Sequence, residues 1–545
     1  MNRIIKYLIL LFFLIMNLFS LTDAQKKWLK NNPDELPHWK TKDEKRLERE
    51  SYRTFSETEP PVGPIRQVAE FQPMYGVMIR YPLGLPYDFI AELSTETKLI
   101  IVVSSYYYDD AYSAFENNNV NMDNCEFLLE PTDSYWCRDF GPWFIFNGND
   151  ELGVINFPYN RPRPNDDDIP IEFAAEYGFQ LYGMNIEHTG GNYMCDGMGK
   201  AASTDLVLAE NADLTEEEIS SLVNQYLGIE EYLLFDDPLG EYIEHIDCWG
   251  KFLDVDKILI GEVSESDPRY DDYEAIADYF ENATSSYEKP YEVYRVFTPG
   301  DYPYTPYTNS LIVNDRVFVP ITGSEWDNEA IASYEEAMPG YEIIGVEYSD
   351  WLNTDALHCR TRGIADPEML YIEHTPLSGT LESRDSYEIS ARIIDHSESG
   401  FISDSLRIYY KYNTGDDYTF SHLTSINDTL FTGEIPYNFE TDSLYYYLHA
   451  ADNSGRSENH PYIGQSDPHS FQILNIQTPE NLTISYQDTS FVLSWDPVSD
   501  AVSYNIYMKN SQGSDWELIQ NSENNSIQIP VTENRFQLFR VTAVK

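Results

Sequence analysis

One pattern recurs five times between Val68 and Asp366, and it constrains the fold of this 545-residue chain more than any other feature. A polar-faced helix leads into an apolar strand, then a loop rich in Gly, Asp, Asn or His, then a second apolar strand. The expected helices are Asp110–Asn118, Asp168–Tyr177, Glu216–Tyr226, Tyr273–Asn282 and Asn328–Met338. Similar units at near-constant spacing are typical of a repeat architecture. We therefore predict an α/β domain of five units over residues 67–366.

Each of the five loops carries polar or reactive side chains. The loops read WCRDFGPW (136–143), HTGGN (188–192), EHIDCWG (244–250), YTNS (307–310) and ALHCRTRG (356–363). Measured from Arg138 to Cys359 through one polar residue of each loop, the steps are 54, 55, 62 and 50 residues. Ordinary α/β alternation without closure would leave these loops apart. If equivalent loops face one axis, a single pocket receives Asp139, His245, Asp247, Asn309 and Cys359.

Cys359 is the candidate nucleophile of this pocket. The chain has five cysteines, an odd number, and no two have C-x-x-C spacing, which argues against a full disulfide framework and against a paired-thiolate zinc site. A lone cysteine more often packs as a small buried hydrophobe, since a reactive thiolate needs a special environment. A bond between Cys137 and Cys248, which flank proposed site residues, is an open alternative.

Two carboxylates, a histidine and a thiol suit the hydrolysis of a guanidinium group. The planar fork of guanidinium N–H donors matches carboxylates in bidentate fashion, which leaves its central carbon open to attack by a thiolate. The carboxylates stabilise the charge of the tetrahedral adduct. A histidine protonates the departing ammonia and then activates water against the covalent thiouronium. The net reaction would convert arginine to citrulline and ammonia.

These motifs resemble those of guanidino-group-modifying enzymes of the pentein fold, a propeller of five ββαβ-type units. The resemblance is greatest to the bacterial (Porphyromonas-type) peptidylarginine deiminases, with agmatine deiminases next, and it covers Val68–Asp366 and the module that follows. It implies that Cys359 is the nucleophile and His245 the general acid and base. Asp139 and Asp247 would bind the guanidinium, and Asn309 would be a further polar site residue. Trp136 would lie along the substrate side chain, where an aromatic face can also hold a cation.

The stretch NRPRP (160–164) distinguishes two substrate classes. Arg161 and Arg163 match positions at which bacterial peptidylarginine deiminases bind the C-terminal carboxylate of a peptide ending in arginine, and Tyr242 matches a third contact. Two such arginines could equally be solvated surface. Agmatine has no carboxylate and would gain nothing from them. The resemblance thus favours a C-terminal arginine, with a small guanidine such as agmatine or free arginine as the alternative.

The first 24 residues predict an exported protein. Arg3 and Lys6 precede an apolar run too short to span a bilayer, and small residues follow up to Ala24, as in a secretory signal peptide. Residues 25–66 are polar and charged and are expected to be a pro-segment or a loosely attached arm. Within them, Lys40–Arg53 could form a short exposed helix. We expect a secreted or cell-surface location.

The charge of the chain restricts its partners. There are 35 Lys and Arg against 92 Asp and Glu, a net charge of −57, which argues against nucleic acid as a partner. The charge favours a cationic substrate, such as an arginine-containing peptide or protein, although solubility alone could explain most of it. No cofactor is expected to be required. Acidic runs such as Asn165–Asp168 lack the EF-hand pattern, so a solvated face is expected there, with structural calcium as an alternative.

After Pro367 the helical pattern ends and short alternating strands begin. Residues 367–474 read as an immunoglobulin-like β-sandwich, and residues 475–545, with LSWDPV and SYNIY, resemble a fibronectin type III module. Neither carries a catalytic constellation, so spacing, surface display or export are the expected roles. A non-catalytic surface adhesin on an old enzyme scaffold is the alternative from a different functional class.

Overall fold

The computed structural model describes most of the chain. Its described residues are 23–32, 35–47, 55–240, 242–300, 303–437, 441–474, 479–487, 489–499, 501–509, 516–531 and 537–544. The predicted signal peptide lies outside them apart from its last two residues. Among the described residues, no helix combines the length and the apolar character needed to cross a bilayer.

Five small sheets make up residues 66–365 of the described chain, and all follow one plan. In each sheet a central strand pairs antiparallel with one neighbour and parallel with another. The sheets, in spatial order, are β17 (Arg362–Ala365), β2 (Met74–Tyr81), β3 (Lys98–Val103) and β4 (Cys125–Leu128); β1 (Arg66–Gln67), β5 (Trp143–Phe146), β6 (Leu152–Asn156) and β7 (Gln180–Gly183); β8 (Met194–Cys195), β9 (Lys200–Thr204) and β10 (Glu231–Phe235); β11 (Gly250–Asp254), β12 (Lys257–Glu262) and β13 (Glu292–Phe297); and β14 (Leu311–Val313), β15 (Arg316–Ile321) and β16 (Glu342–Glu347). The predicted five-unit repeat is confirmed.

The five predicted helices are present within three residues of the expected ends. They are α4 (Tyr108–Asn117), α7 (Ile169–Tyr177), α9 (Glu216–Leu227), α10 (Tyr270–Asn282) and α11 (Asp327–Ala337). Helix α9 shows why the pattern is readable: Thr215 and Glu218 form a capping box at its start, and Gly228 ends it in the left-handed conformation. Shorter helices escape the pattern, namely α3 (Tyr87–Leu93), α5 (Cys137–Phe140), α6 (Pro164–Asp167) and α8 (Leu206–Glu210).

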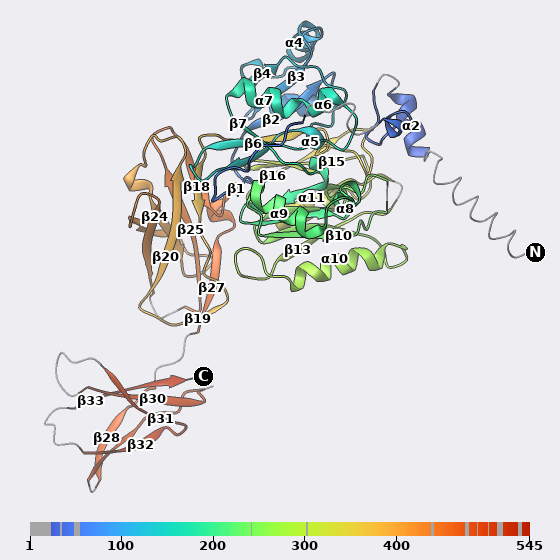
Figure 1. Cartoon of the computed structure of the whole chain (residues 1–545). Coiled ribbons are helices and arrows are strands. Elements are labelled where there is room, and N and C mark those ends of the chain that lie inside the picture. Colours follow the sequence, from blue (N-terminus) through green and yellow to red (C-terminus); the bar gives the residue numbers. More distant parts are fainter. Residues whose placement is uncertain are drawn as a thin grey trace, which may run out of the picture.

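The last unit closes onto the first. Strand β17 pairs antiparallel with β2, so Gly363 lies opposite Val77 although the two are almost 300 residues apart in sequence. The strands and helices form a rounded body in which the helices lie outside the sheets (Figure 1). The closed arrangement lets loops from all five units reach the same end of the domain.

Residues 23–47 pack against this domain, which corrects the expectation of a loosely attached arm. Helix α2 (Asp23–Asn31) buries Trp28, and the turn after it buries His38 and Trp39. The helix expected over Lys40–Arg53 is only the 3-10 turn η1 (Glu44–Arg46), and residues 48–53 lie outside the described chain. In the described part of the chain, the segment packs through its buried aromatic residues and pairs with no strand of the domain.

Two sheets follow over residues 370–474. One contains β18 (Leu370–Glu373), β20 (Ser386–Asp395), β24 (Leu430–Pro436) and β23 (Thr424–Ser425); the other contains β19 (Thr380–Glu382), β27 (His469–Leu474), β25 (Ser443–Ala451), β21 (Arg407–Lys411) and β22 (Thr419–His422), with β26 (Ser457–His460) paired to β25. Strand β25 alternates buried and half-buried residues along its whole length, as a strand of a two-sheet sandwich should.

This sandwich shares a core with the five-unit domain. Met369, Tyr371 and Ile394 belong to the same apolar cluster as Val154 and Ile364. At the polar edge of the contact, both guanidinium N–H groups of Arg456 donate to the carboxylate of Asp366, at 2.7 and 2.9 Å. The two parts are therefore packed together, beyond the spacing role expected from the sequence.

The described residues between 483 and 544 form two further three-stranded antiparallel sheets. They contain β28 (Thr483–Gln487), β29 (Ser490–Ser494) and β32 (Ser526–Pro530), and β31 (Glu517–Ser522), β30 (Ser503–Lys509) and β33 (Leu538–Val544). Leu493, Trp495, Tyr504 and Ile506 contribute to their common core. The immunoglobulin-like and fibronectin type III assignments of the two C-terminal parts stay predictions.

Candidate active site

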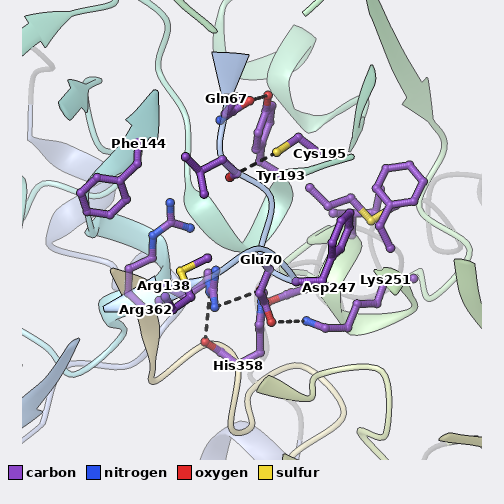
Figure 2. Close-up of a pocket in the computed structure, with 18 residues that line it drawn as sticks. Gln67, Glu70, Arg138, Phe144, Tyr193, Cys195, Asp247, Lys251, His358 and Arg362 are labelled. Atoms are coloured by element: carbon purple, nitrogen blue, oxygen red, sulfur yellow. Dashed lines mark hydrogen bonds and ion pairs between the residues drawn. The ribbon is translucent and has the colours of Figure 1, made fainter. Parts of the chain in front are cut away.

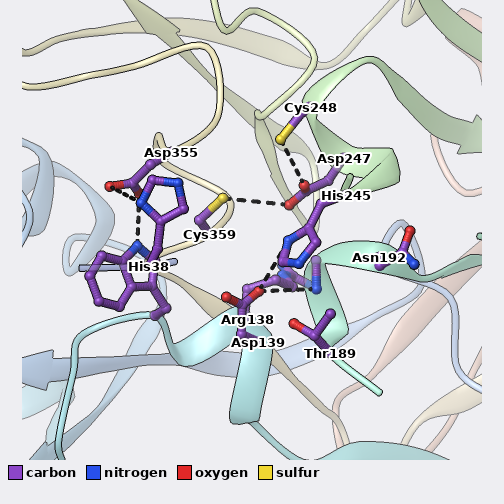
Figure 3. Close-up of polar contacts among 12 residues, drawn as sticks. His38, Arg138, Asp139, Thr189, Asn192, His245, Asp247, Cys248, Asp355 and Cys359 are labelled. Atoms are coloured by element: carbon purple, nitrogen blue, oxygen red, sulfur yellow. Dashed lines mark hydrogen bonds and ion pairs between the residues drawn. The ribbon is translucent and has the colours of Figure 1, made fainter. Parts of the chain in front are cut away.

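The five loops singled out by the sequence meet at one place. Their meeting is held by a closed series of hydrogen bonds, in which each loop is bonded to the next. The bonds are Gly191 N to Asp139 Oδ1 (3.2 Å), Ile246 N to Asn192 Oδ1 (3.3 Å), Thr308 Oγ1 to Asp247 O (3.2 Å), His358 N to Asn309 O (3.0 Å) and Arg138 N to Cys359 O (3.2 Å). The predicted convergence is thus present. Figure 3 shows Asp139, His245, Asp247 and Cys359 around one point, and the fifth predicted catalytic residue, Asn309, contacts Cys359.

Cys359 is held on both sides by Asn309. The Asn309 side-chain Nδ2 lies 3.3 Å from Cys359 Sγ, and its Oδ1 accepts a hydrogen bond from Cys359 N at 3.2 Å. Asp247 Oδ2 lies 3.7 Å from the same sulfur. Burial, followed by the negative charge of Asp247, raises the pKa of the Cys359 thiol well above its ordinary value. In this form of the protein Cys359, the candidate nucleophile, is a thiol.

Asp139 and His245 face each other beside Gly191. Asp139 Oδ1 lies 3.7 Å from His245 Nδ1 and accepts the Gly191 backbone hydrogen bond. Burial and the nearby charge of Asp247 raise the pKa of Asp139 to about 7. Burial lowers the pKa of His245 to about 3, so its ring is neutral, and its Nε2 is buried with no hydrogen-bond partner among the described residues.

Gly191 cannot carry a side chain here. A Cβ at this position would lie 2.6 Å from His245 Nδ1, 2.7 Å from Asp139 Oδ1 and 3.3 Å from Asp247 Oδ2. The Gly-Gly pair of the HTGGN loop therefore makes a turn and also leaves room for three site side chains to lie close to the backbone. The histidine of that loop, His188, points away from the site and bonds Tyr232 OH at 3.0 Å.

His358, the residue before Cys359, contacts the carboxylate of Asp247. Its Nδ1 lies 2.7 Å from Asp247 Oδ2 and its Nε2 lies 2.5 Å from Glu70 Oε2. Both ring nitrogens face a carboxylate oxygen, so a doubly protonated ring would donate a hydrogen bond to each. The two carboxylates favour that form, while burial and then the charge of Arg138 lower the pKa of His358. Burial would raise the pKa of Asp247, but the hydrogen bond and charge of His358 outweigh it and lower that pKa. Asp247 is the ionised member of the carboxylate pair.

Glu70 binds the positively charged side chains of a cavity next to the site. Its carboxylate contacts Lys251 Nζ at 2.8 Å and Arg138 Nη2 at 3.1 Å as well as His358 (Figure 2). The cavity has a volume of about 60 Å³. Burial works against ionisation of Glu70, but the charges of His358, Lys251 and Arg138 lower its pKa well below the ordinary value. Neither Glu70 nor His358 was assigned from sequence, because no motif letter distinguishes them.

Trp136 is positioned by Asp355, a third residue that was not assigned from the sequence. The indole Nε1 donates to Asp355 Oδ1 at 3.0 Å, and Arg360 binds both oxygens of the same carboxylate at 2.9 and 2.7 Å. Asp355 lies four residues before the nucleophile, so its place in that stretch was the available signal. This pairing fixes the aromatic wall of the site.

Arg161, Arg163 and Tyr242 lie on the rim, and each is engaged by the N-terminal segment. Arg161 Nε donates to His38 O at 3.1 Å, and Arg163 Nη2 donates to Pro37 O. Tyr242 OH lies 3.0 Å from His38 Nε2. Structure thus brings all four predicted substrate-binding residues, Trp136 included, to one surface, and that surface is covered.

Two other expectations change. All five cysteines are free, so no bond joins Cys137 and Cys248. The run Asn165–Asp168 is not a solvated face, because Asp166 is buried and accepts hydrogen bonds from Ser134 N and Oγ. Among the described residues, no group of three or more His, Cys, Asp or Glu is arranged to hold a metal ion.

Comparisons with known proteins show the family to which the chain belongs. Residues 86–364, just over half of the chain, match the model of the family described as Porphyromonas-type peptidyl-arginine deiminase. A Shewanella baltica protein named for agmatine deiminase is 26% identical over 273 residues, which cover 42% of this chain and 73% of that protein. A Shewanella frigidimarina protein of the same name is 24% identical over 271 residues, with 42% and 73% coverage.

Solved structures show the same fold. The structure of an Enterococcus faecalis agmatine deiminase is 19% identical, with a TM-score of 0.50, and covers 57% of this chain and 100% of that one. A Porphyromonas gingivalis structure named for arginine deiminase is 20% identical, with a TM-score of 0.51, and covers 56% of this chain and 98% of that one. At these identities the likeness establishes the fold of the five-unit domain.

Proposed function

Because the chain belongs to the Porphyromonas-type peptidyl-arginine deiminase family, we propose that it is an exported peptidylarginine deiminase that prefers C-terminal arginine. At the coarser level the protein is a deiminase of the arginine and agmatine type, a hydrolase that acts on C–N bonds. One observation carries the proposal: Cys359 Sγ lies 3.7 Å from Asp247 Oδ2 at the point where Asp139 and His245 also meet.

The guanidinium of the substrate supplies a positive charge to the two carboxylates of the site. Asp139 and Asp247 are two buried carboxylates, and the pKa of Asp139 is raised to about 7 in part by its neighbour. A guanidinium between them neutralises this repulsion and gives both carboxylates a bidentate partner. The same cation stabilises the thiolate form of Cys359, which burial otherwise disfavours.

The first half of the reaction forms a covalent intermediate. His245, neutral at rest, accepts the thiol proton at Nε2, and the Cys359 thiolate attacks the central guanidinium carbon. The C–S bond forms, a C–N bond breaks, and the His245 imidazolium returns its proton to the departing nitrogen as ammonia. Asn309, which bonds both the sulfur and the backbone of Cys359, keeps the thiol aimed.

The second half hydrolyses the thiouronium. His245, again neutral, takes a proton from water, and the resulting hydroxide adds to the same carbon. The C–S bond breaks as the carbonyl forms, and the proton held by His245 passes to the sulfur. The hydroxyl proton of the adduct is released to solvent, where it converts the ammonia to ammonium, and the ureido group of citrulline remains. No step in this scheme uses a metal or another cofactor, and a structural calcium ion would act only on stability.

The rim supports a substrate with a terminal carboxylate. Arg161 and Arg163 donate to the main-chain carbonyl oxygens of His38 and Pro37, so their N–H groups point at oxygen acceptors of a polypeptide lying over the site. A C-terminal carboxylate offers the same type of acceptor with a full negative charge, and charge-assisted hydrogen bonds are the stronger ones.

The alternative is a deiminase of a small guanidine. The relatives named for agmatine deiminase favour it, because this chain covers 73% of their length. Agmatine presents a guanidinium and an amine but no carboxylate, so it would leave Arg161 and Arg163 without a substrate partner.

A substrate panel separates these functions. Citrulline or ammonia release is measured from a peptide ending in Arg, a peptide with internal Arg, free arginine and agmatine, with and without a calcium chelator. We expect the C-terminal Arg peptide to be best, with no effect of the chelator on turnover. Arg161→Ala should raise KM for the peptide ending in Arg and leave KM for agmatine, which has no carboxylate, unchanged. Best turnover of agmatine would refute the proposed substrate class.

A further inference from the structure

The N-terminal segment, residues 23–32 and 35–47, covers the candidate site with aromatic rings. Trp28 and His38 lie 6.0 and 5.6 Å from Trp136 between ring centroids, and Trp39 lies 5.6 Å from both Trp28 and Tyr242. Trp28 and Trp39 belong to the same buried apolar cluster as Trp136 and Cys359. The segment therefore supplies one wall of the space around the nucleophile.

Polar contacts fasten the same segment to the residues assigned to substrate. Arg163 donates from Nε to Glu44 Oε1 at 3.0 Å and from Nη2 to Pro37 O. Arg161 binds His38 O, and Tyr242 OH binds His38 Nε2. Every side chain proposed to hold the arginine substrate outside the catalytic point already has a partner in the segment.

The covering leaves the reacting groups closed to solvent. Cys359 is 2% exposed, His245 1%, Asp139 3% and Asp247 4%. A peptide substrate needs an open path to the sulfur and a free rim, and the packed segment leaves neither. The folded chain as described is an inactive arrangement of a complete set of catalytic residues.

The segment is attached to the domain mainly through this surface. Its two helical pieces, α2 and η1, pair with none of the described sheets. Outside the rim, Glu35 binds Arg80 at 3.1 Å and Lys40 lies 3.9 Å from Glu187. Helix α2 turns Lys26, Lys27 and Lys30 to the outside and Trp28 toward the domain. Such a segment can leave without disturbing the strand pairing of the five units.

We infer that residues 23–47 are an intramolecular inhibitor that occupies the substrate-binding surface, and that the active enzyme is the form from which this segment has been displaced or cut. The inference rests on the proposed function for the meaning of that surface. It also gives the surface a partner chemistry: an extended peptide whose carbonyl or carboxylate oxygens meet Arg161 and Arg163 and whose aromatic side chains meet Trp136.

The first test measures access to Cys359 and needs no deiminase activity. The full chain is treated with iodoacetamide, and alkylation of each cysteine is followed by peptide mass spectrometry. In the Trp28→Ala/Trp39→Ala double variant, Cys359 should react about tenfold faster or more than in the wild type, since the apolar cover is lost. Lys27→Ala, an exposed change on the same helix, is the matched control and should react as the wild type does.

Three buried cysteines report on folding in the same sample. Cys137, Cys195 and Cys248 should stay slow in the double variant, because they lie inside the domain. Faster reaction of all four buried cysteines would show that the variant unfolds. Equal Cys359 rates in wild type and double variant, with the fold intact, would overturn the inference.

The second test cuts the segment away. Residues 48–54 are replaced by the recognition sequence of a specific protease, and the same preparation is assayed before and after cleavage. We expect citrulline release from a C-terminal Arg peptide to rise at least tenfold after cleavage, and a synthetic peptide of residues 23–47 to reverse the rise. Unchanged Cys359 alkylation after cleavage contradicts the inhibitor; faster alkylation without turnover of any guanidine contradicts the proposed function instead.

Discussion

At the scale of single residues, the site depends on side chains that touch no substrate. His358 bridges Asp247 and Glu70, and Glu70 also binds Lys251 and Arg138. This buried network keeps Asp247 ionised although its neighbour Asp139 has a raised pKa. The two neighbouring carboxylates therefore have different pKa values, because His358 contacts Asp247 and not Asp139.

Replacing His358 should change the pH profile as well as the rate. In His358→Gln, Asp247 loses a charged hydrogen bond and its pKa rises, so the acid limb of kcat/KM should move to higher pH. Loss of one hydrogen bond to a charged group predicts a fall in kcat/KM of about ten- to hundredfold. A pH–rate profile of the cut enzyme measures both effects. A uniform fall with an unmoved acid limb would mean that His358 acts only through packing.

Gly191 gives a second residue-scale prediction. Gly191→Ala places a methyl group within 2.6 Å of His245 Nδ1 and 2.7 Å of Asp139 Oδ1, so these side chains must move. A displacement of about 1 Å at the reacting groups predicts a fall in kcat of about a hundredfold. Gly415→Ala is the matched control, because an added Cβ meets no atom there within 4 Å. Wild-type kcat in Gly191→Ala would contradict the described approach.

The sequence predicted those site residues that stand in recognisable motifs. Asp139, His245, Asp247, Asn309 and Cys359 lie on five equivalent loops, so the repeat alone indicated that they meet. The prediction missed His358, because neighbours on a strand alternate faces and the position beside Cys359 does not show which way the ring points, whereas His358 lies in a turn beside Asp247. Asp166 was missed for a related reason: an acidic run reads as solvated unless its backbone partners are known.

At the scale of elements, the N-terminal segment was the least predictable part. Its composition is polar, and the contacts that order it join Trp28 and His38 to residues more than 100 positions away. Local patterning carries no information on such contacts. The available signal of packing was the presence of three aromatic rings, Trp28, His38 and Trp39, among many charged residues.

His38 makes the docking of this segment depend on pH. Burial lowers the pKa of docked His38 to about 4, and Arg161, Arg163 and Arg360 add to this while Asp355 opposes it. A released His38 has its ordinary pKa near 6.5, so the released form binds the proton more readily. Docking is therefore fully favoured above about pH 6.5 and weakens as the pH falls toward 4.

Hydrogen–deuterium exchange over residues 23–47 can check this. After correction for the intrinsic pH dependence, the segment should exchange faster at pH 5 than at pH 7 relative to the strands of the five-unit domain. In His38→Gln, which has no titrating ring, the two pH values should give the same relative exchange. A pH effect of equal size in that variant would assign the response to another group.

At the scale of the whole molecule, the five-unit domain does not end where its repeat ends. Met369, Tyr371 and Ile394 of the sandwich complete an apolar cluster that includes Val154 and Ile364. Asp366 and Arg456 close its edge with two hydrogen bonds. The change of sequence texture after Pro367 marked the sandwich but gave no sign of this shared core, because both sides of the contact read as ordinary buried residues.

Truncation experiments should reflect the shared core. A chain that ends at residue 474 removes a part whose core is made of its own residues, and the melting temperature of the five-unit domain should stay within about 2 °C of wild type. A chain that ends at Asp366 exposes the cluster and should melt several degrees lower or aggregate. Calorimetry of both chains tests this. Equal melting temperatures would show that the sandwich does not stabilise the domain.

The pairing of β17 with β2 has a consequence for biosynthesis. Cys359, the proposed nucleophile, comes three residues before the strand that closes the domain, so it joins Asp139, His245 and Asp247 only when the last unit of the repeat is in place. A ribosome must deliver residues 362–365 before β2, which already pairs with β3, gains its antiparallel neighbour. Every shorter nascent chain leaves one edge of β2 unpaired and the series of five loops open. The enzyme therefore gains its chemistry in a single late event rather than unit by unit.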